Sequence, residues 1–500
     1  MIKISENIRQ NSNLKVWTTA LKIVGLLLMM ESAFMALCSL ASLFAEQYTA
    51  VWYTIISALI TLVCGFLLWL PLRKLNLEID KRTGFLAVTL IWVIFSLFGL
   101  LPAYLGGYVP SFVDAFFETM SGFTTTGCSV VEDVEALPYS IGLWREMTQW
   151  IGGIGIIVIM LSIISFAGGG GLSLFSAEVA GIDKSKIAPH IRQTAFALLI
   201  VYTSLTVIYF LTYYFLGMSL YDAICYAFTT VATAGLASKN TSVMEFSPAI
   251  QCAMIFFMFI SGHNLLLIYS LAKGRLKELK RSEEMHVYWA VFLIVSLIIF
   301  IMVVFQQGFS DQNLTSIGES LKNSLFMTIS VLTSTGLINC DYTLWPVGAI
   351  LILIMLMNSG AMSGSTSGGL KLVRMMVLFK NAKNTIFKAI HSNAFIPVTV
   401  NHKMIETQTL YNVFNMFMLY ILTLVVGAIF LVAFGVKMDE AFVSSVSALC
   451  NMGPGFNESA FGNFAHFSDL AKITMAIMMC IGRLELITVF ALFSKSFRRR

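Results

Sequence analysis

FVDAFFETMSGFTTTG, residues 112–127, joins a short apolar segment to a threonine-rich turn that ends in glycine. Equivalent tracts end at Gly235, Gly336 and Gly453, so the four glycines are 108, 101 and 117 residues apart. An acid or amide stands thirteen residues before each glycine and a hydroxyl six residues before: Asp114, Asp222, Asn323 and Glu440, then Ser121, Thr229, Ser330 and Ser447. Repeats of this length indicate one structural unit used four times.

Each tract predicts a short helix followed by an extended loop. A residue able to cap, about eight apolar residues and a hydroxyl-rich turn predict a re-entrant helix of about two to three turns, too short to span a bilayer. Non-helical backbone at membrane depth is tolerated only where it is buried in protein or lines a wet cavity. Ordinary surface turns are the alternative, since such clusters are common in turns, but the fourfold register favours a pore loop.

The composition is that of a membrane protein. Hydrophobic residues make up 57% of the 500 residues, charged residues only 12%, and the mean hydropathy is +0.82. Apolar runs of about twenty residues recur along the chain, which is the length of a membrane-spanning helix. We therefore expect an all-α polytopic membrane protein with two N-terminal transmembrane helices and four helix/pore-loop/helix repeats in pseudo-fourfold arrangement around one pore. The expected divisions are 1–82 for the N-terminal pair and 83–185, 186–283, 284–400 and 401–500 for the repeats.

Basic residues are distributed unequally between the connections. If ten spans are drawn, 26 of the 32 Lys and Arg fall on one side, whereas Arg145, Lys239, Lys322, Lys437 and Lys472 fall on the other and Arg483 lies within a span. Cytoplasmic loops carry the excess of Lys and Arg, so both termini are predicted to be cytoplasmic. The net charge of +5 then reflects membrane topology rather than nucleic-acid binding.

The four glycine tracts are candidate ligands for a cation. Four helix C-termini aimed at one axis would place partial negative charge there, and the following carbonyl oxygens could replace the water around an ion. The candidate filter residues are Thr125, Thr126, Gly127, Thr233, Ala234, Gly235, Ser334, Thr335, Gly336, Asn451, Met452 and Gly453.

Three stretches carry a family likeness: MSGFTTTGCSVVEDVEALPYSIGLWREMTQWIGGIGIIV from Met120, NSGAMSGSTSGGLKLVRMMVLFK from Asn358 and IGRLELITVFALF from Ile481. The sequence resembles the membrane subunits of the Trk/Ktr/HKT superfamily of potassium transporters, and most of all the TrkH type, over essentially its whole length. The resemblance implies a filter glycine in each repeat, potassium as substrate, and a homodimer in the bacterial inner membrane. It also implies a cytoplasmic regulatory ring of the TrkA type, with nucleotide bound only by that partner.

The second helix of the third repeat is interrupted between residues 358 and 369 by glycines and hydroxyls, which a continuous membrane helix would accommodate poorly. We interpret this segment as a hinge or plug beneath the filter, and the family's gating loop lies here; close packing of helices through small residues is the alternative. The candidate gating residues are Gly360, Gly364, Ser365, Gly368, Gly369, Lys371 and Arg483.

Arg483 is costly within a span and is therefore expected to face water, a partner or the pore. The resemblance implies a positive barrier below the filter, and a salt bridge to a neighbouring helix is the alternative. The basic clusters at residues 273–281 and 371–388 read as topology signals and also as a docking surface for the regulator.

The predicted function is gated potassium uptake, driven by the membrane potential. The alternative is a secondary symporter coupling potassium to protons or sodium, a class that usually shows inverted repeats and a charged midplane site. A structural membrane protein is a third class. An enzyme is not expected, because no nucleophile, base and orienting group can be assembled, and the glycine run at 168–171 lacks the rest of a phosphate-binding loop.

Overall fold

The computed structural model describes residues 12–73, 81–155, 191–307, 314–391, 396–401 and 403–494. The glycine run at 168–171 and several of the predicted cytoplasmic cations, including those at both termini, lie outside these ranges.

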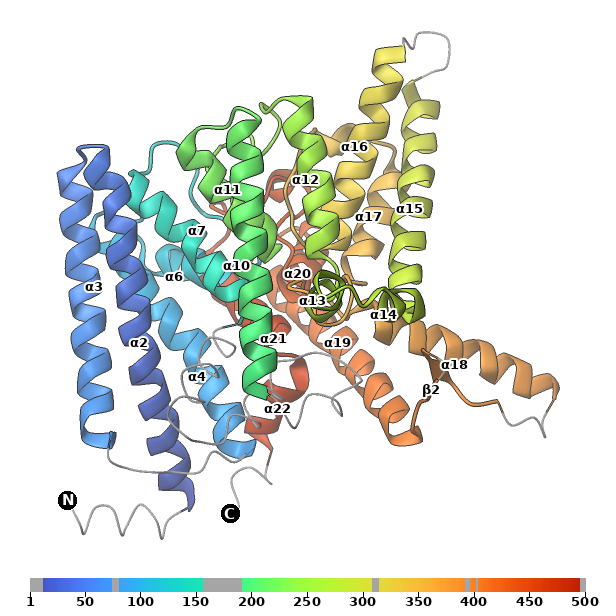
Figure 1. Cartoon of the computed structure of the whole chain (residues 1–500), viewed down its shortest axis with the longest axis horizontal. Helices are drawn as coiled ribbons and strands as arrows, with labels where there is room; N and C mark the ends of the chain where they lie inside the picture. Colours follow the sequence, from blue (N-terminus) through green and yellow to red (C-terminus); the bar gives the residue numbers. More distant parts are fainter. Residues whose placement is uncertain are drawn as a thin grey trace.

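The N-terminal pair is a hairpin of two long helices, α2 (Ser12–Phe44) and α3 (Tyr48–Trp69), which continues into the 3-10 turn η1 (Leu70–Leu72). Figure 1 shows the pair side by side at one edge of the molecule. Gly25 and Gly65 let the two backbones approach closely, since a β-carbon on either would lie 2.8 Å from the other's carbonyl oxygen. Such contacts between small residues are typical of helix packing in membranes.

Each repeat contains a long first helix, a short pore helix and a second helix. The first helices are α4 (Lys81–Gly99), α10 (Ile191–Phe215), α15 (Glu283–Gln307) and α19 (Thr407–Ala433). The pore helices are α6 (Phe112–Phe123), α11 (Leu220–Ala232), α16 (Leu314–Leu332) and α20 (Met438–Cys450). The second helices are α7 (Tyr139–Gly153), α12 (Pro248–Ser261), α17 (Val347–Met357) and α21 (Asp469–Arg483).

The remaining elements are short, apart from α18. They are α5 (Leu101–Leu105), α13 (Leu265–Ala272), α14 (Leu276–Arg281), α18 (Leu372–Ile390), α22 (Leu486–Phe493), η3 (Tyr342–Leu344), η4 (Asn457–Ser459) and the antiparallel strands β1 (Thr399–Val400) and β2 (Lys403–Met404).

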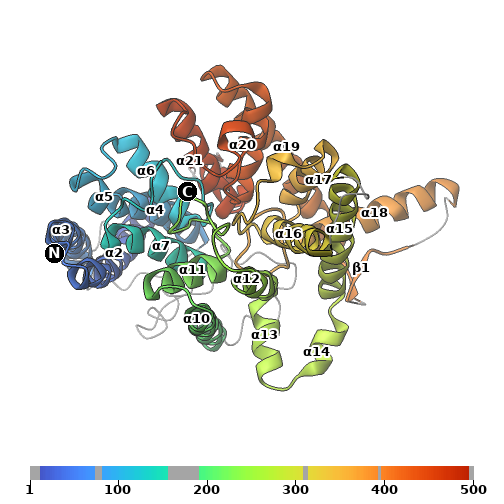
Figure 2. The same cartoon turned by 90° about the horizontal axis from the view of Figure 1, so that it is seen from above.

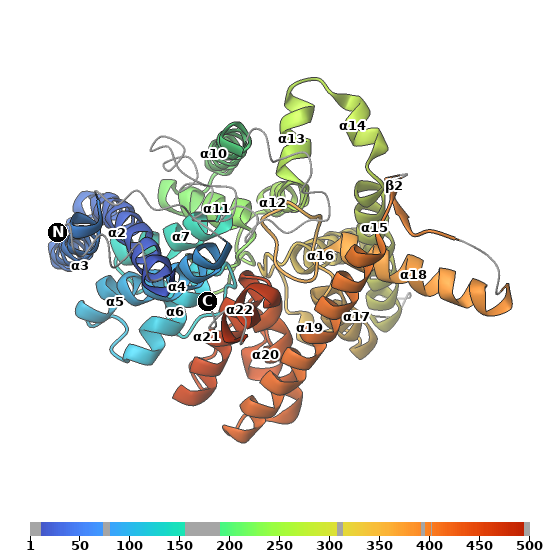
Figure 3. The ribbon, with the colours of Figure 1, turned by 90° about the horizontal axis from the view of Figure 1, so that it is seen from below.

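Seen from above, α6, α11, α16 and α20 lie around one centre, with the longer helices outside them (Figure 2). The same order is visible from below, where α18 runs outward from the bundle (Figure 3). The predicted all-α polytopic fold with two extra N-terminal helices is confirmed.

Six described helices are long and apolar enough to cross a membrane, and the pair α12 and α13, bent by 99°, would make a seventh if it is one span. The first helices expose large apolar side chains, such as Ile294 (58% exposed) and Leu293 (58%) on α15. These surfaces suit contact with lipid rather than water.

Several expectations about the repeats were wrong in detail. The second helices of repeats 2 and 4 are broken rather than continuous, since α12 gives way to α13 and α21 to α22. The interruption predicted in repeat 3 is confirmed, because α17 ends at Met357 and α18 begins only at Leu372. The pore helix α16, with 19 residues, is longer than predicted, against 12 in α6. The acids Asp114 and Asp222 do not cap; Ser111 and Ser219 do, each accepting a hydrogen bond from the amide of the acid three residues later.

Two of the predicted outer-surface charges are buried. Arg145 is 9% exposed and its Nε lies 2.5 Å from Oε1 of Glu118. Lys472 is 4% exposed and its Nζ lies 2.6 Å from Oδ1 of Asp114, which joins α21 of repeat 4 to α6 of repeat 1. Both cations therefore hold helices together, and a count of charges per connection could not distinguish that role from exposure.

Candidate ion-binding site

All four pore helices end in the same hydrogen-bonded turn. In repeat 1 the amide of Thr126 donates to the carbonyl of Ser121 (2.8 Å), and the amide of Thr125 donates to Gly122 (2.9 Å). The other repeats reproduce the longer bond: Ala234 to Thr229 (3.1 Å), Thr335 to Ser330 (2.8 Å) and Met452 to Ser447 (3.1 Å). This pair of bonds defines a Schellman motif, which needs a left-handed residue just after the helix.

The left-handed residue in each motif is not a glycine. It has φ between 52° and 54° in all four repeats and is Thr125, Thr233, Ser334 or Asn451. A β-branched residue rarely adopts this conformation, and such strain tends to collect at functional sites. Two residues later come the four repeat glycines, also with positive φ: Gly127 (85°), Gly235 (91°), Gly336 (77°) and Gly453 (103°). Sequence reasoning placed both the glycines and these four residues among the filter candidates, but it did not predict the left-handed backbone of the latter.

The four glycine segments form a closed ring. A β-carbon built on Gly453 of repeat 4 would lie 2.9 Å from the carbonyl oxygen of Thr126 in repeat 1. Each of the other three glycines faces the equivalent carbonyl of the next repeat more closely still: Gly127 faces Ala234, Gly235 faces Thr335 and Gly336 faces Met452. The contacts run in the order 1, 2, 3, 4 and back to 1, so the structure brings all twelve candidate filter residues together.

The carbonyls of this ring have no hydrogen-bond donors within the described part of the chain: Thr126, Ala234, Thr335 and Met452. The four residues are 0–1% exposed. The amides of these residues, and those of the residues just before them, donate to carbonyls of the pore helices. Their own carbonyl oxygens are therefore the backbone groups left to bind a ligand. Buried carbonyls without donors are unfavourable unless something else binds them, and a dehydrated cation is the chemical partner that four oxygens suit.

Repeat 4 keeps this geometry despite its different sequence. Asn451 adopts the left-handed conformation that asparagine tolerates better than threonine does. Its Nδ2 donates to Oγ1 of Thr126 (3.0 Å) and to the carbonyl of Met479 (2.9 Å), so it ties repeat 4 to repeat 1. Cys450 Sγ is within 2.7 Å of the hydroxyl of Tyr420. The residues that differ in repeat 4 therefore keep the backbone conformation seen in the other repeats, and Asn451 also contacts repeat 1.

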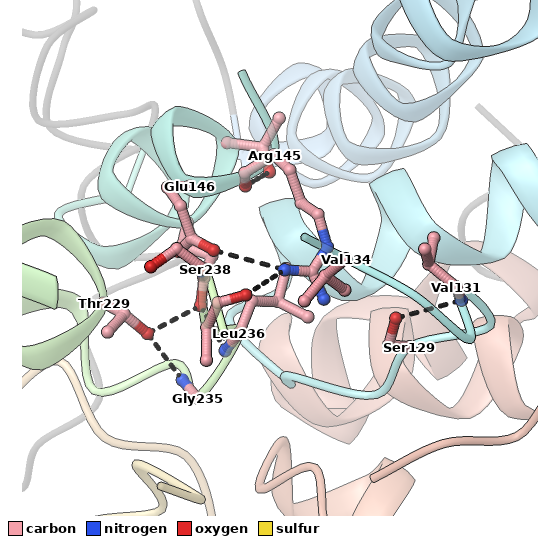
Figure 4. A network of polar contacts seen from close by, with 12 residues as sticks. Ser129, Val131, Val134, Arg145, Glu146, Thr229, Gly235, Leu236 and Ser238 are labelled. Carbon is pink, nitrogen blue, oxygen red and sulfur yellow. Dashed lines mark hydrogen bonds and ion pairs between the residues drawn. The ribbon is translucent and has the colours of Figure 1, made fainter. Parts of the chain in front are cut away.

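A buried polar network supports the ring between repeats 1 and 2, and sequence reasoning missed it. Gln149 Oε1 on α7 accepts from Thr229 Oγ1 and from the amide of Leu236, both at 3.0 Å. Thr229 Oγ1 in turn accepts from the amide of Gly235 (2.9 Å). Figure 4 shows Arg145 and Glu146 of α7 beside this turn of repeat 2. The available signal was the polar run REMTQ in a helix that must be largely buried.

Arg145 is the centre of that network. Besides Glu118, its guanidinium bonds to Glu146 Oε1 (3.2 Å) and donates to the carbonyl of Ala237 just beyond the second ring glycine (2.9 Å). Glu118 also accepts from Ser129 Oγ (3.0 Å) and from the amide of Val130 (2.9 Å), directly after the first ring glycine. One arginine and one glutamate thus fix the chain that follows two of the four ring glycines.

The interrupted segment of repeat 3, residues 358–369, is hereafter called the plug segment. It lies against the ends of three pore helices. Thr366 Oγ1 donates to the carbonyl of Val231 (3.2 Å) and accepts from Thr233 Oγ1 (3.0 Å), and the amide of Gly368 donates to Ser334 Oγ (2.6 Å). A β-carbon on Gly368 would also collide with the carbonyl of Cys450. The plug segment therefore contacts the strained residues of repeats 2 and 3 directly.

The first half of the plug segment is anchored elsewhere. The amide of Ser363 donates to Glu284 Oε1 (2.6 Å), its carbonyl accepts from Asn264 Nδ2 (2.7 Å), and Gly364 faces the Asn264 side chain. Gly360 and Gly369, with φ of 64° and 75°, close the segment on itself. Of the candidate gating residues, Gly368 contacts Ser334 and Cys450 at the ends of two pore helices, whereas Gly360 and Gly364 hold the shape and anchorage of the segment.

Arg483 joins the plug segment to repeat 1. Its NH1 donates to the carbonyl of Thr366 (2.9 Å), and its NH2 donates to the carbonyls of Gly152 (2.6 Å) and Gly153 (3.1 Å) at the end of α7. Its guanidinium also lies 5.9 Å from the centre of the Trp92 ring. The neighbouring Glu485 pairs with Arg374 of α18 at 2.8 Å. With this arginine, the plug segment is connected to all four repeats.

A helical bundle of apolar spans that folds four re-entrant segments round one ring of buried carbonyls defines a class: membrane transport proteins with a single pseudo-fourfold centre. The TrkH family model, described as cation transport protein, matches residues 53–499. The chain belongs to the TrkH family, whose members are transport proteins rather than enzymes.

The relatives are similar along almost their whole length. The chain is 34% identical to the Trk system potassium uptake protein TrkH of Salmonella typhimurium, over 96% of this chain and 98% of that protein. It is 32% identical to TrkG of Escherichia coli, over 86% and 88%. The crystal structure of the potassium transporter TrkH from Vibrio parahaemolyticus superposes with a TM-score of 0.87 at 29% identity, covering 97% of this chain and 100% of that one.

Proposed function

We propose that the chain takes up potassium through the carbonyl ring, which acts as a selectivity filter. The buried carbonyls of Thr126, Ala234, Thr335 and Met452 carry this proposal. They accept no hydrogen bond from the described residues, so they can offer a bare cation the oxygens that it loses with its water. The names of the relatives, potassium uptake proteins of Trk systems, support the choice of ion.

The pore helices add to the attraction. Their C-terminal ends lead directly into the ring, and a helix C-terminus carries partial negative charge. Moving one charge through a potential of 100 mV releases roughly 2.3 kcal/mol, so an inside-negative potential can drive uptake without a second ion.

The plug segment is the proposed gate. It bonds to Thr233 and Ser334, the first residues of two proposed filter segments, and the guanidinium of Arg483 donates to its Thr366 carbonyl. A loop held by side-chain hydrogen bonds rather than by a continuous helix can change position at modest cost. Arg483 also places a positive charge beside the path proposed for the ion.

We further propose a homodimer in the bacterial inner membrane with both termini cytoplasmic, regulated by a TrkA-type ring that binds the nucleotide. Two exposed basic regions support a docking surface: Lys273, Arg275, Lys280 and Arg281 around α14, and Lys383 and Lys388 on α18. Because α18 begins directly after the plug segment, a partner bound there could move the gate. Crosslinking of the intact complex in membranes would test this arrangement.

Purified protein in liposomes tests the function directly. With opposing potassium and sodium gradients, the reversal potential should follow the potassium gradient, and imposing a proton gradient should leave it unchanged. A shift with the proton or sodium gradient would instead establish the symporter. Equal permeability to potassium and sodium, or no rubidium uptake above protein-free liposomes, would reject the filter.

A further inference from the structure

Lys371 is a buried cation whose ligands all come from the plug segment. The side chain is 6% exposed and follows the plug segment at the start of α18. Its Nζ donates to the carbonyl of Ser365 (3.2 Å) and to that of Ser367, and lies 3.2 Å from Ser367 Oγ and 3.5 Å from Ser365 Oγ. Two serines thus supply two carbonyl and two hydroxyl oxygens to one ammonium group, an arrangement hereafter called the serine cage.

The position of this lysine is unfavourable apart from the serine cage. Its backbone has φ of 70°, which is strained for a residue with a side chain. It also stands at the N-terminus of α18, where the helix dipole disfavours a cation. The four oxygen contacts, with the nearby carboxylates of Glu284 and Glu485, offset the strain, the dipole and the burial. Carbonyl and hydroxyl oxygens so arranged also suit a monovalent metal cation.

The serine cage lies beside the residue that meets the filter. Thr366, between the two serines, bonds to Thr233 of repeat 2 and to Arg483. On the proposed path, an ion leaving the carbonyl ring would meet the plug segment, to which these oxygens belong. Potassium carries the same charge as an ammonium group and takes the same ligands, carbonyl and hydroxyl oxygens.

We propose that Ser365 and Ser367 form a second cation site, filled by the protein's own Lys371 ammonium in this structure and by potassium once Lys371 withdraws. The inference rests on the proposed function, since it assigns the gate an occupant that the conducted ion replaces. In this structure the Lys371 ammonium would then occupy the position that a potassium ion takes when the plug segment has moved.

Two ion pairs hold α18 in the position that places Lys371 in the serine cage. Arg374, one turn after Lys371, pairs with Glu485 at the break between α21 and α22, so that pair and the serine cage hold the same end of the helix. Further along, Lys380 pairs with Glu283 and donates to the carbonyl of Thr399 (2.8 Å). A force on the exposed end of α18 would pull Lys371 away from the serines.

The test uses the full-length protein with Lys371→Met, which removes the ammonium but keeps an unbranched apolar stem. Thermal unfolding is measured in potassium, sodium and choline chloride at equal ionic strength. A ligand that binds only the folded state raises the unfolding temperature. The variant should show a larger potassium-specific rise than the wild type, and anomalous scattering from rubidium should appear between Ser365 and Ser367 only in the variant.

Two further variants make the result specific. Adding Ser365→Ala and Ser367→Ala to Lys371→Met should abolish the extra rise, whereas Lys437→Met, which breaks an exposed pair with Glu458, should behave as wild type. If Lys371→Met does not fold, Lys371→Gln replaces it in the test. Because this variant also loses the charge-assisted hydrogen bonds of the ammonium, its basal rubidium flux without any partner should rise about tenfold.

The outcomes separate the two proposals. An unchanged potassium effect and no rubidium signal at the serines, in a variant of a protein that still conducts potassium selectively, would overturn the second site alone. A wild-type protein with neither selective flux nor any potassium-specific stabilisation would instead overturn the filter.

Discussion

The Cα of Gly453 faces the carbonyl oxygen of Thr126, with 2.9 Å between that oxygen and the place of a β-carbon. This contact joins the last repeat to the first and closes a ring that the chain enters in four separate places. Because every repeat contributes one glycine and one carbonyl, each glycine controls the space available to its neighbour's oxygen. A side chain at one glycine would therefore disturb a carbonyl in another repeat.

Gly235→Ala should abolish potassium selectivity. The new methyl would collide with the carbonyl oxygen of Thr335, and the residue would carry a side chain at φ of 91°. Either the oxygen moves from the ring or the backbone flips, and both change the ion's ligands. We expect the ratio of potassium to sodium permeability, measured from reversal potentials in liposomes, to fall towards one.

Gly217→Ala is the matched control for that substitution. Gly217 has a similar φ of 102°, but nothing lies within 4 Å of the place that a β-carbon would take. It therefore reproduces the backbone strain, about 1 kcal/mol, without the collision. Selectivity should be retained in this variant, and an equal loss in both would show that strain rather than ring geometry accounts for the effect.

Arg483→Ala should raise the basal potassium flux in the absence of any partner, by about tenfold or more. Its guanidinium holds Thr366 and the end of α7 through three carbonyls, and each charge-assisted bond is worth about 1.5–3 kcal/mol. Flux into liposomes measures the change. Arg483→Lys keeps the positive charge but not the geometry of the guanidinium, so its basal flux should lie between those of the wild type and Arg483→Ala.

If Arg483→Ala and the wild type show equal basal flux, the plug segment is not held closed by this residue. Equal flux in Arg483→Ala and Arg483→Lys, both raised, would show that the hydrogen bonds matter and the charge does not. The two variants thus distinguish closure by the hydrogen bonds of Arg483 from repulsion of the ion by its charge.

The sequence predicted the repeats well because their signal is local. A glycine, a hydroxyl and an acid in fixed register are readable without knowing what they touch, and the four glycines indeed meet. What the glycines contact could not be read, since it depends on the order of the repeats in space. Thr125, Thr233 and Ser334 were predicted as filter residues, but their left-handed backbone was not, because threonine and serine give no sequence signal for that conformation.

The buried charges show a different limit. Arg145 and Lys472 were assigned to the outer surface because they fall in connections, and hydropathy alone cannot tell a buried ion pair from a solvated one. The pairing partners, Glu118 and Asp114, lie 27 and 358 positions away in the chain. Only the fold brings them together, and the same is true of Gln149, which accepts from the amide of Leu236 in repeat 2.

Arg145→Met should destabilise the protein strongly, by about 3–5 kcal/mol, because it leaves both Glu118 and Glu146 buried without their cation. Glu118→Gln should cost less, since Arg145 keeps Glu146. Thermal unfolding of purified protein measures both. Lys437→Met is the control, as its pair with Glu458 is exposed and 3.4 Å long, worth less than about 1 kcal/mol. If Arg145→Met lowers the stability no more than Lys437→Met does, the buried network around Arg145 contributes little to the stability of the protein.

Acid should loosen the outer contact between repeats 1 and 2. There Asn240 Nδ2 donates to Asp133 Oδ1 (2.8 Å), and Lys239 Nζ lies 2.8 Å from Glu135 Oε2. The hydrogen bond from Lys239 lowers the pKa of Glu135 below its ordinary value of 4.5, and the bond from Asn240 lowers the pKa of Asp133. A carboxyl whose pKa is depressed by folding stabilises the protein above its unfolded pKa and loses that contribution as the pH falls.

The wild type should therefore lose stability more steeply below about pH 4.5 than Glu135→Gln, which has no carboxylate to protonate there. The difference should stay under about 1 kcal/mol, because Glu135 is 37% exposed and water screens the pair. Unfolding temperatures between pH 3 and pH 7 measure it. Glu132→Gln removes a charge from the same loop without touching these contacts, so its curve should follow the wild type. Parallel curves for wild type and Glu135→Gln would show that the pair between Lys239 and Glu135 contributes nothing to stability.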